Sequence, residues 1–447
     1  MAAEGIVYDP GDCSLELEVE LALDVDVEGI TARHEISLIK ALEHDNEADW
    51  ESYIASIRSY ASENGVNLEG DPFARLMTES QRIEITKRIN DDLTYKKSNC
   101  DKYDYMIAAT CGMVAGLVDV FFIGLPGTSK IGEAADKTVD SAVMGVSKLF
   151  GWKGPRDPEG NSVKSAVGYL ERNYSVNYDQ ALSNSPNKKM GTSGQVKNLT
   201  PKNHHIKSLG HSPDLIGLLF SIINQFTSTS TFVSDGRLIT IDTETFELKG
   251  NNFPAKVFAG FCNWLGHIAS DMAGSSGSKG RGAGVPIPFY SLLQFIDVGS
   301  FGQHRDTFAK VAVKVFEEGY DLRHGVALAV PVLIAELMTR LAWTFKQKVY
   351  HQKEWNECIP TANNPELRRM LLVAHGTLCL VDGVDAGLRS GGDIVQFMLR
   401  SNILAWARFG TLAIKELRAW YKVGHIDIDA ANEHLDKEYA KLLENQL

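Results

Sequence analysis

The sequence predicts a mainly α-helical fold, a multi-helix bundle with a small antiparallel β portion. Three observations support this prediction. Apolar residues recur at helical spacing through most of the 447-residue chain. One stretch, Met106 to Gly124, is almost free of charge, and strand patterns occur at only two places. We take this apolar stretch as the element around which the chain is organised.

The apolar stretch reads MIAATCGMVAGLVDVFFIG, and its only charged residue is Asp119. Small residues recur at every fourth position, at Ala108, Gly112 and Gly116, so that on a helix another backbone can approach closely. Its length is close to the roughly 20 apolar residues that a membrane span needs. A Pro-Gly break and a second helix follow, which predicts a hairpin over residues 106–150, stored in the fold or touching a membrane.

Composition excludes several classes of protein. The net charge of −12 argues against a general nucleic-acid binder, which needs a basic face. The six cysteines are scattered and form no C-x-x-C pair, which argues against a zinc ribbon or a disulfide-rich secreted scaffold. No basic segment followed by an apolar run occurs at the N-terminus, so no signal peptide is predicted.

Residues 1–30 are predicted to form an acidic, strand-forming arm, since Leu and Val alternate with Glu and Asp from Leu15 to Val27 and no Lys or Arg occurs. A hairpin near 232–248, with its turn at Ser234–Gly236, provides further strands, and the two parts could meet in one sheet. One interpretation of the arm is a solvated strand. The alternative is a docking arm for a basic protein partner.

The rest of the chain is predicted to be helical. Residues 31–183 form one helical region, residues 184–201 form a linker, and residues 202–447 form a helical domain that also contains a Gly/Ser loop at 273–284. A helix ending near Phe226 is apolar on nearly every face and should therefore be buried. Later helices are expected at about 254–272, 285–298, 303–319, 322–350, 364–389, 392–421 and 428–445.

Charged residues interrupt these apolar helices. An isolated charge in a dry core or in lipid costs several kcal/mol, so each must pair or reach water. For Asp119, an arginine is the simplest partner. Three interpretations stay open: a soluble core with ion pairs, a polar path through a membrane bundle, and peripheral attachment by the hairpin. The residues that we expect in buried ion pairs are Asp119, Glu336, Arg340, Asp385, Arg389, Arg400 and Arg408.

A first candidate site is rich in histidine. His204, His205 and His211 precede the apolar helix that ends near Phe226, and His267 and Asp271 lie four residues apart on one helical face. Neutral imidazole and carboxylate suit zinc, manganese or iron. The candidate ligands of a divalent metal are His205, His211, His267 and Asp271. The spacing is not that of an H-E-x-x-H motif, and the alternative is capping and hydrogen bonding within the core.

A second candidate site is the Gly/Ser loop, whose backbone N–H groups and cations can cradle a phosphate. It is not a Walker A loop, because Gly280 follows Lys279. The alternative is a plain linker. The candidate phosphate-binding residues are Ser275, Ser276, Ser278, Lys279 and Arg281.

Two function hypotheses follow. The first is a binding or effector protein whose apolar hairpin is buried or touches a membrane. The second is a soluble metal-dependent hydrolase that acts on a phosphoester, if the two candidate sites converge. No G-x-S-x-G elbow supports Ser-His-Asp catalysis.

Four segments of the chain resemble bacterial proteins carried on mobile genetic elements. The resemblance implies a bacterial source and no particular reaction, and it links the effector hypothesis to mobile-element or phage-defence biology. With the cysteine content, it predicts a cytoplasmic protein, at most peripheral to the inner membrane. The segments are GLVDVFFIGLPG, HHIKSLGHSPDLIGLLFSIINQFTSTSTFV, AGSSGSKGRGAGVPIP and LVDGVDAGLRSGGD.

Overall fold

The computed structural model describes residues 50–65, 78–95, 97–157, 159–180, 196–274, 283–361 and 364–445. The chain divides into two compact units, Met1–Asp91 and Asp92–Leu447. The first unit holds α3 (Trp50–Glu63) and nearly all of α4 (Glu79–Asp92). The acidic arm predicted at residues 1–30 lies outside the described residues.

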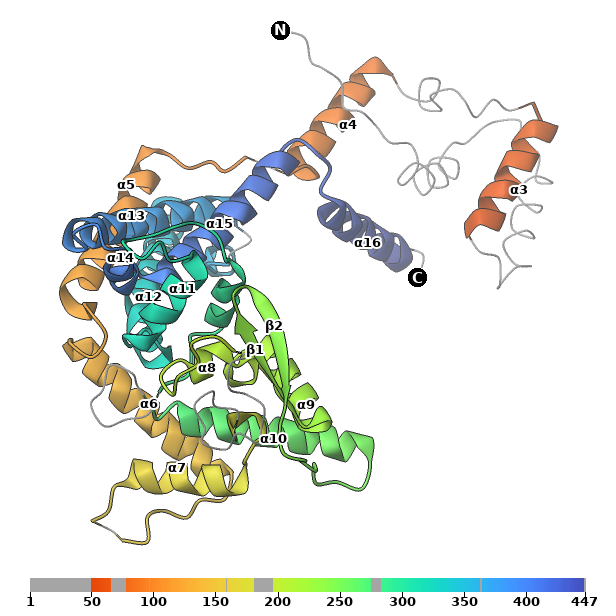
Figure 1. Ribbon diagram of the computed structural model, residues 1–447. Coiled ribbons are helices and arrows are strands. Elements are labelled where there is room, and N and C mark those ends of the chain that lie inside the picture. The colour runs from red at the N-terminus through yellow and green to blue at the C-terminus, as the bar shows by residue number, and fades with distance from the viewer. Residues whose placement is uncertain are drawn as a thin grey trace. The chain divides into compact units, whose positions relative to one another are not determined.

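Helices dominate the second unit, and the only sheet among the described residues has two strands, which confirms the predicted fold class (Figure 1). Between its first two long apolar helices, the described part of the second unit contains six shorter α-helices: α6 (Lys130–Leu149), α7 (Ser162–Asn173), α8 (His204–Lys207), α9 (Leu215–Thr227), α10 (Phe253–Asp271) and α11 (Phe308–Glu317). The chain ends with α14 (Ile394–Arg400), α15 (Ile403–Lys422) and α16 (Ile428–Asn445).

The predicted central helix exists as α5 (Lys102–Val118), which continues through a π-helical turn at Asp119–Ile123. It packs most extensively on α13 (Pro365–Arg389) and also on α12 (Leu322–Phe345). The small-residue stripe lies in this contact, because Ala108, Gly112 and Gly116 are all buried. A Cβ atom on Gly112 would lie only 2.0 Å from the carbonyl oxygen of Ala374 on α13, so the close approach depends on the stripe.

The predicted hairpin is formed by β1 (Thr229–Ser234) and β2 (Arg237–Asp242), which pair antiparallel with Ser234 opposite Arg237. Asp235 and Gly236 both have positive φ, 49° and 72°, as a two-residue hairpin turn requires. The strands end at Asp242, short of the expected residue 248.

The segment assigned to a linker, 184–201, falls inside the second unit. Its described part is packed, because Val196 and Leu199 are buried against Phe232 and Ile241 of the hairpin. Residues on both sides of it also share contacts, since α7 packs on α10 and α6 packs on α12. Helices α6, α7 and α10 therefore pack close to one another, and the histidine-rich segment lies among them in the sequence.

Three helix predictions differ from the structure. The helix expected at 285–298 is only a 3-10 turn at Tyr290–Phe295, because Pro286 and Pro288 hold the residues before them extended. The helix expected at 392–421 breaks into α14 and α15, because the Asn402 side chain caps the start of α15. Helix α9 is not buried all round: Leu215 and Leu219 are exposed.

Glu336 is the centre of a charge cluster in the bundle. Its carboxylate accepts hydrogen bonds from Arg340 and Arg408, and Nε2 of His375 lies 3.0 Å from Oε2 of Glu336. Asp385 and Arg389 also pair, at 2.8 Å, but the Arg389 side chain is 48% exposed, so this pair is not buried.

Two other charges do not behave as expected. The predicted arginine partner of Asp119 is wrong: within the described chain, its Oδ1 accepts a hydrogen bond from Nδ2 of Asn402 at 2.9 Å. Arg400 makes no ion pair with any described residue, and its Nε is buried without a hydrogen-bond partner. An amide can satisfy a buried carboxyl group as an arginine can, and spacing along the sequence does not distinguish them.

Replacing Glu336 with alanine is expected to lower the free energy of unfolding by about 2–3 kcal/mol, because two partly buried guanidinium groups lose their common carboxylate. The measurement is thermal unfolding followed by circular dichroism. As a control, Glu433→Ala breaks an exposed pair with Lys437 and should not shift the midpoint. Equal midpoints for the two variants would contradict a stabilising role for the cluster.

Candidate metal centre

Four elements from three separate parts of the sequence place the candidate ligands. His204 and His205 lie on α8, and His211 ends the 3-10 turn Leu209–His211 just before α9. His267 and Asp271 lie in the last part of α10, and Asp179 lies in the 3-10 turn Tyr178–Gln180. Two N-caps fix where the neighbouring helices begin. The Asp214 side chain caps α9, which follows His211, and the Asn252 side chain caps α10.

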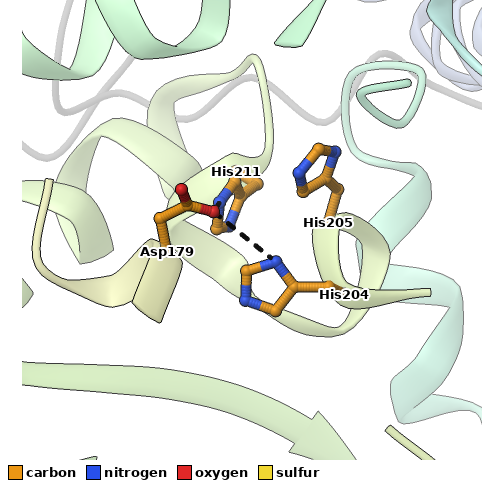
Figure 2. Close-up of side chains that lie close together, drawn as sticks. All are labelled: Asp179, His204, His205 and His211. Atoms are coloured by element: carbon orange, nitrogen blue, oxygen red, sulfur yellow. Dashed lines mark ion pairs between the residues drawn. The ribbon is translucent and has the colours of Figure 1, made fainter. Parts of the chain in front are cut away.

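A first ligand group consists of Asp179, His204, His205 and His211, whose candidate ligand atoms all lie within 4.8 Å of one another (Figure 2). Oδ1 of Asp179 lies 3.6 Å from Nε2 of His211 and 3.9 Å from Nδ1 of His204. These separations are too long for hydrogen bonds, and one ion can occupy the space between such atoms.

A second ligand group consists of His211, His267 and Asp271, whose candidate ligand atoms also lie within 4.8 Å of one another. Oδ2 of Asp271 lies 3.2 Å from Nε2 of His267 and 3.7 Å from Nε2 of His205. The two groups therefore share His211, and Asp271 reaches toward both. All six side chains form one continuous cluster.

Several polar atoms of this cluster are buried and have no hydrogen-bond partner. Leaving such an atom unsatisfied costs about 1–3 kcal/mol, so a native protein rarely tolerates several together. A bound cation would satisfy them at once. The atoms are Nε2 of His204, both ring nitrogens of His211, Nε2 of His267 and Oδ2 of Asp271.

The electrostatics of the cluster suit a cation. Burial lowers the pKa of His204 to about 3, and it also lowers the pKa values of His205 and His211, so these imidazoles are neutral and have a free lone pair. Burial raises the pKa of Asp271 to about 7. Burial acts in the same direction on Asp179, but His211 and the neighbouring histidines outweigh it and lower its pKa.

Outer contacts orient the rings. Nδ1 of His205 donates to the carbonyl oxygen of Gly284 at 3.0 Å, which leaves Nε2 as the ligand atom. The ring of Tyr178 stands edge-on to His211, with centroids 5.0 Å apart, and its hydroxyl lies 2.8 Å from Oγ of Ser221. A Cβ atom on Gly210 would lie 2.9 Å from the Tyr178 ring, so this packing requires glycine.

Arg323, at the start of α12, holds the end of α10 in place. Its guanidinium donates to the carbonyl oxygens of Met272, Ala273 and Gly274, and it pairs with Asp136 and Asp140 on α6. The arginine side chain is only 3% exposed. It therefore fixes the backbone directly after the ligand Asp271.

Replacing Arg323 with glutamine is expected to weaken metal binding about 10-fold, because Asp271 loses the support that positions it. The measurement is the dissociation constant for Zn²⁺ in competition with a chelating dye. Arg305→Gln is the control, since the Arg305 side chain is exposed and donates a hydrogen bond to Oγ of Ser300, away from the cluster. Unchanged affinity in the Arg323 variant, with its fold intact, would contradict a positioning role.

The structure brings together all four of the residues selected from the sequence as metal ligands, His205, His211, His267 and Asp271. It also brings in His204, which belongs to the histidine-rich segment but was not among the four selected ligands, and it adds Asp179, which no spacing pattern in the sequence connects with the others. The five candidate phosphate-binding residues, from Ser275 to Arg281, lie outside the described residues.

The fold and the site define a helical protein with a buried histidine–carboxylate cluster. Comparisons with family models, with curated proteins and with solved structures find no match to this chain. Its function is therefore argued from the chemistry of the cluster.

Proposed function

We propose that this protein is a hydrolase that depends on a divalent transition metal. The observation that carries the proposal is the convergence of four imidazoles and two carboxylates, with five buried ligand-type atoms that lack a hydrogen-bond partner. This donor set suits zinc, manganese or iron(II). At least one metal ion binds in the cluster, and because both ligand groups include His211, a second ion could bind beside the first.

Features of the cluster favour a catalytic over a structural metal. Structural zinc sites are closed and four-coordinate, commonly with cysteine ligands, whereas the candidate ligands here are histidine and aspartate only. The Asp179 side chain is 50% exposed, so the cluster reaches solvent on that side. When bound, a divalent metal would supply Lewis-acid chemistry and a water of lowered pKa.

The proposed substrate class is a phosphoester. The Gly/Ser loop, which has Lys279 and Arg281 in its sequence, leaves α10 three residues after Asp271 and rejoins the described chain next to Gly284, the partner of His205. The described residues at the two ends of the loop are therefore close to the candidate ligands Asp271 and His205. Cations and backbone N–H groups near a metal are the usual means of holding a phosphoryl group.

The test is turnover of bis(p-nitrophenyl) phosphate and p-nitrophenyl phosphate by the protein loaded with Zn²⁺, Mn²⁺ or Fe²⁺. We expect hydrolysis of one of the two esters that is lost on chelation and falls at least about 100-fold in His211→Ala. His304→Ala, at an exposed histidine outside the cluster, should keep full activity. Tight metal binding without turnover of either ester would contradict the hydrolase but not the metal centre.

A membrane-attached protein is the second candidate function, and a separate observation favours it. Three helices are long and apolar enough to cross a membrane, Lys102–Ile123, Leu322–Tyr350 and Pro365–Arg389. We propose that these helices hold the protein at a membrane, in agreement with the hypothesis of a membrane-touching hairpin. Complete recovery in the supernatant of a detergent-free lysate, as a monodisperse species, would contradict it.

A further inference from the structure

Large apolar side chains cover the outside of the bundle, and small side chains make many of the close contacts inside it, beside buried large residues such as Trp343 and Met370. On α12, Leu333, Leu337, Leu341 and Phe345 recur at every fourth position and are all more than half exposed, with Leu341 at 68%. The buried positions of the same helix include Ala327 and Ala335. A water-soluble helix normally shows the opposite arrangement, with its large apolar residues inside.

The neighbouring helices repeat this arrangement. On α13, Leu380, Val384 and Leu388 form an exposed stripe, and Leu388 is 80% exposed. Small side chains line the interior contacts: Ala108 and Ala115 on α5, Ala374 and Ala386 on α13, and Ala405 on α15. Exposed large apolar residues on α5 and α15 are Met106, Met113, Leu117, Phe121, Ile414 and Leu417. Close packing through small residues is typical of helices that associate in lipid.

Two carboxylates of the bundle are turned inward and have partners. Glu336 on α12 meets Arg340, Arg408 and His375, and Asp119, in the π-helical turn after α5, meets Asn402 at the start of α15. Ionisable groups within membrane bundles face the interior and pair in this way, because lipid cannot solvate them.

Contacts between helix termini define one end of the bundle. Lys346, after the end of α12, contacts Asp104 at the start of α5 at 2.7 Å. Arg369, near the start of α13, contacts Glu416, near the end of α15, at 2.6 Å. Nε2 of Gln347, just after α12, donates to Glu366 at the start of α13 at 2.8 Å, which joins the two pairs. Helices α5 and α13 therefore begin, and α12 and α15 end, at this same end of the bundle.

Basic and aromatic side chains gather at this end. Lys348 lies over the ring of Trp355, and Lys422 lies over the ring of Tyr95, at 5.1 Å and 4.9 Å from the centroids. Aromatic side chains mark the membrane–water interface, and an excess of Lys and Arg marks the cytoplasmic side. The residues are Tyr95, Lys97, Lys102, Tyr103, Tyr105, Lys346, Lys348, Tyr350, Trp355, Arg368, Arg369, Arg418, Trp420, Tyr421 and Lys422.

A lipid bilayer fits these faces better than a second copy of the chain. The 25 residues of α13 extend over about 37 Å, enough for a hydrocarbon core of about 30 Å. Exposed stripes occur on four helices, whereas a two-fold interface would cover a single patch and leave the other stripes in water.

We infer that α5, α12 and α13, the three helices that are long and apolar enough, span a bilayer with their basic, aromatic end in the cytoplasm. Helix α15 packs on α13 and crosses with them, although it contains Arg408, Lys415, Glu416 and Arg418. The chain from Leu125 to Asp321, which carries the cluster of histidines and aspartates, then lies on the opposite side of the membrane. This location replaces the expected cytoplasmic, peripheral one. The topology does not depend on the proposed metal function. Only the conclusion that metal chemistry takes place on that side of the membrane rests on it.

The test is labelling of introduced cysteines in intact cells with a maleimide that cannot cross the membrane, with the parent chain as background. Lys249→Cys lies in an exposed loop of the Leu125–Asp321 segment, and Asn356→Cys is its matched control in the exposed turn between α12 and α13. We expect Lys249→Cys to be labelled in intact cells, and Asn356→Cys only after the cells are permeabilised.

Each other outcome would overturn the inference. The reverse pattern contradicts the orientation, and equal protection of both positions in intact cells contradicts the spanning topology. Release of the protein from membranes by an alkaline carbonate wash contradicts spanning, and a soluble oligomer without detergent shows that a second copy covers the stripes. Metal content, measured on the same preparation, is independent of these results, so failure of the topology and failure of the proposed metal function can be distinguished.

Discussion

Replacing His211 with alanine is expected to reduce the metal bound by the purified protein from at least about one equivalent per chain to below about 0.1 equivalent. His211 is fully buried, both of its ring nitrogens lack a partner, and it belongs to both ligand groups. No other side chain of the cluster contributes to both groups, so its loss should have the largest effect. The measurement is elemental analysis by mass spectrometry after gel filtration in buffer without chelator.

The control for this variant is His304→Ala, which removes an exposed histidine outside the cluster and should keep the full metal content. His211→Gln is a second variant that retains a polar side chain, in case the alanine variant does not fold. If His211→Gln folds as the parent does and still holds one equivalent of metal, the cluster is not the binding site.

Replacing Gly112 with alanine is expected to lower the free energy of unfolding by about 3 kcal/mol, the upper end of the usual cost of overpacking. The added Cβ atom would lie 2.0 Å from the carbonyl oxygen of Ala374 and 2.9 Å from Cβ of Thr377. The first of these is a backbone atom that cannot rotate away. Helices α5 and α13 must therefore separate along their whole contact. The measurement is thermal unfolding of the purified protein.

Gly387→Ala is the matched control on α13, because no atom lies within 4 Å of the added Cβ position. Alanine has the higher helix propensity, so this variant should be unchanged or more stable by up to about 1 kcal/mol. If Gly112→Ala were as stable as Gly387→Ala, the small-residue stripe would not determine the packing of α5 on α13.

The features of the fold that could be predicted from the sequence depend on local chemistry. The spacing of Ala108, Gly112 and Gly116 indicated a close helix contact, and the Asp-Gly turn indicated the hairpin. The features that could not be predicted depend on tertiary context. Asn402 interrupts a long apolar pattern because its side chain caps α15 and also contacts Asp119, and periodicity contains no sign of this.

The candidate site could be predicted in part for the same reason. His267 and Asp271 share one helical face, which their spacing already indicates. Asp179 comes from a 3-10 turn beside Tyr178, and it meets His211 only because Tyr178 packs against that ring and against Gly210. Such a contact arises from the folded core and has no counterpart in the spacing of residues along the chain.

Helix α9 and the bundle show how an apolar pattern can mislead. An all-round apolar helix was expected to be buried, but the outer faces of α9, α12 and α13 are exposed. Periodicity indicates that a face avoids water; it does not indicate whether protein or lipid covers that face.

X-ray absorption spectroscopy of the protein loaded with Zn²⁺ tests the central claim most directly. If the histidines and aspartates hold the ion, the zinc edge should show nitrogen and oxygen ligands at about 2.0–2.2 Å, with the outer-shell scattering of at least two imidazole rings. A shell of oxygen atoms alone, without imidazole scattering, or a sulfur shell at about 2.3 Å, would contradict a metal centre built from these side chains.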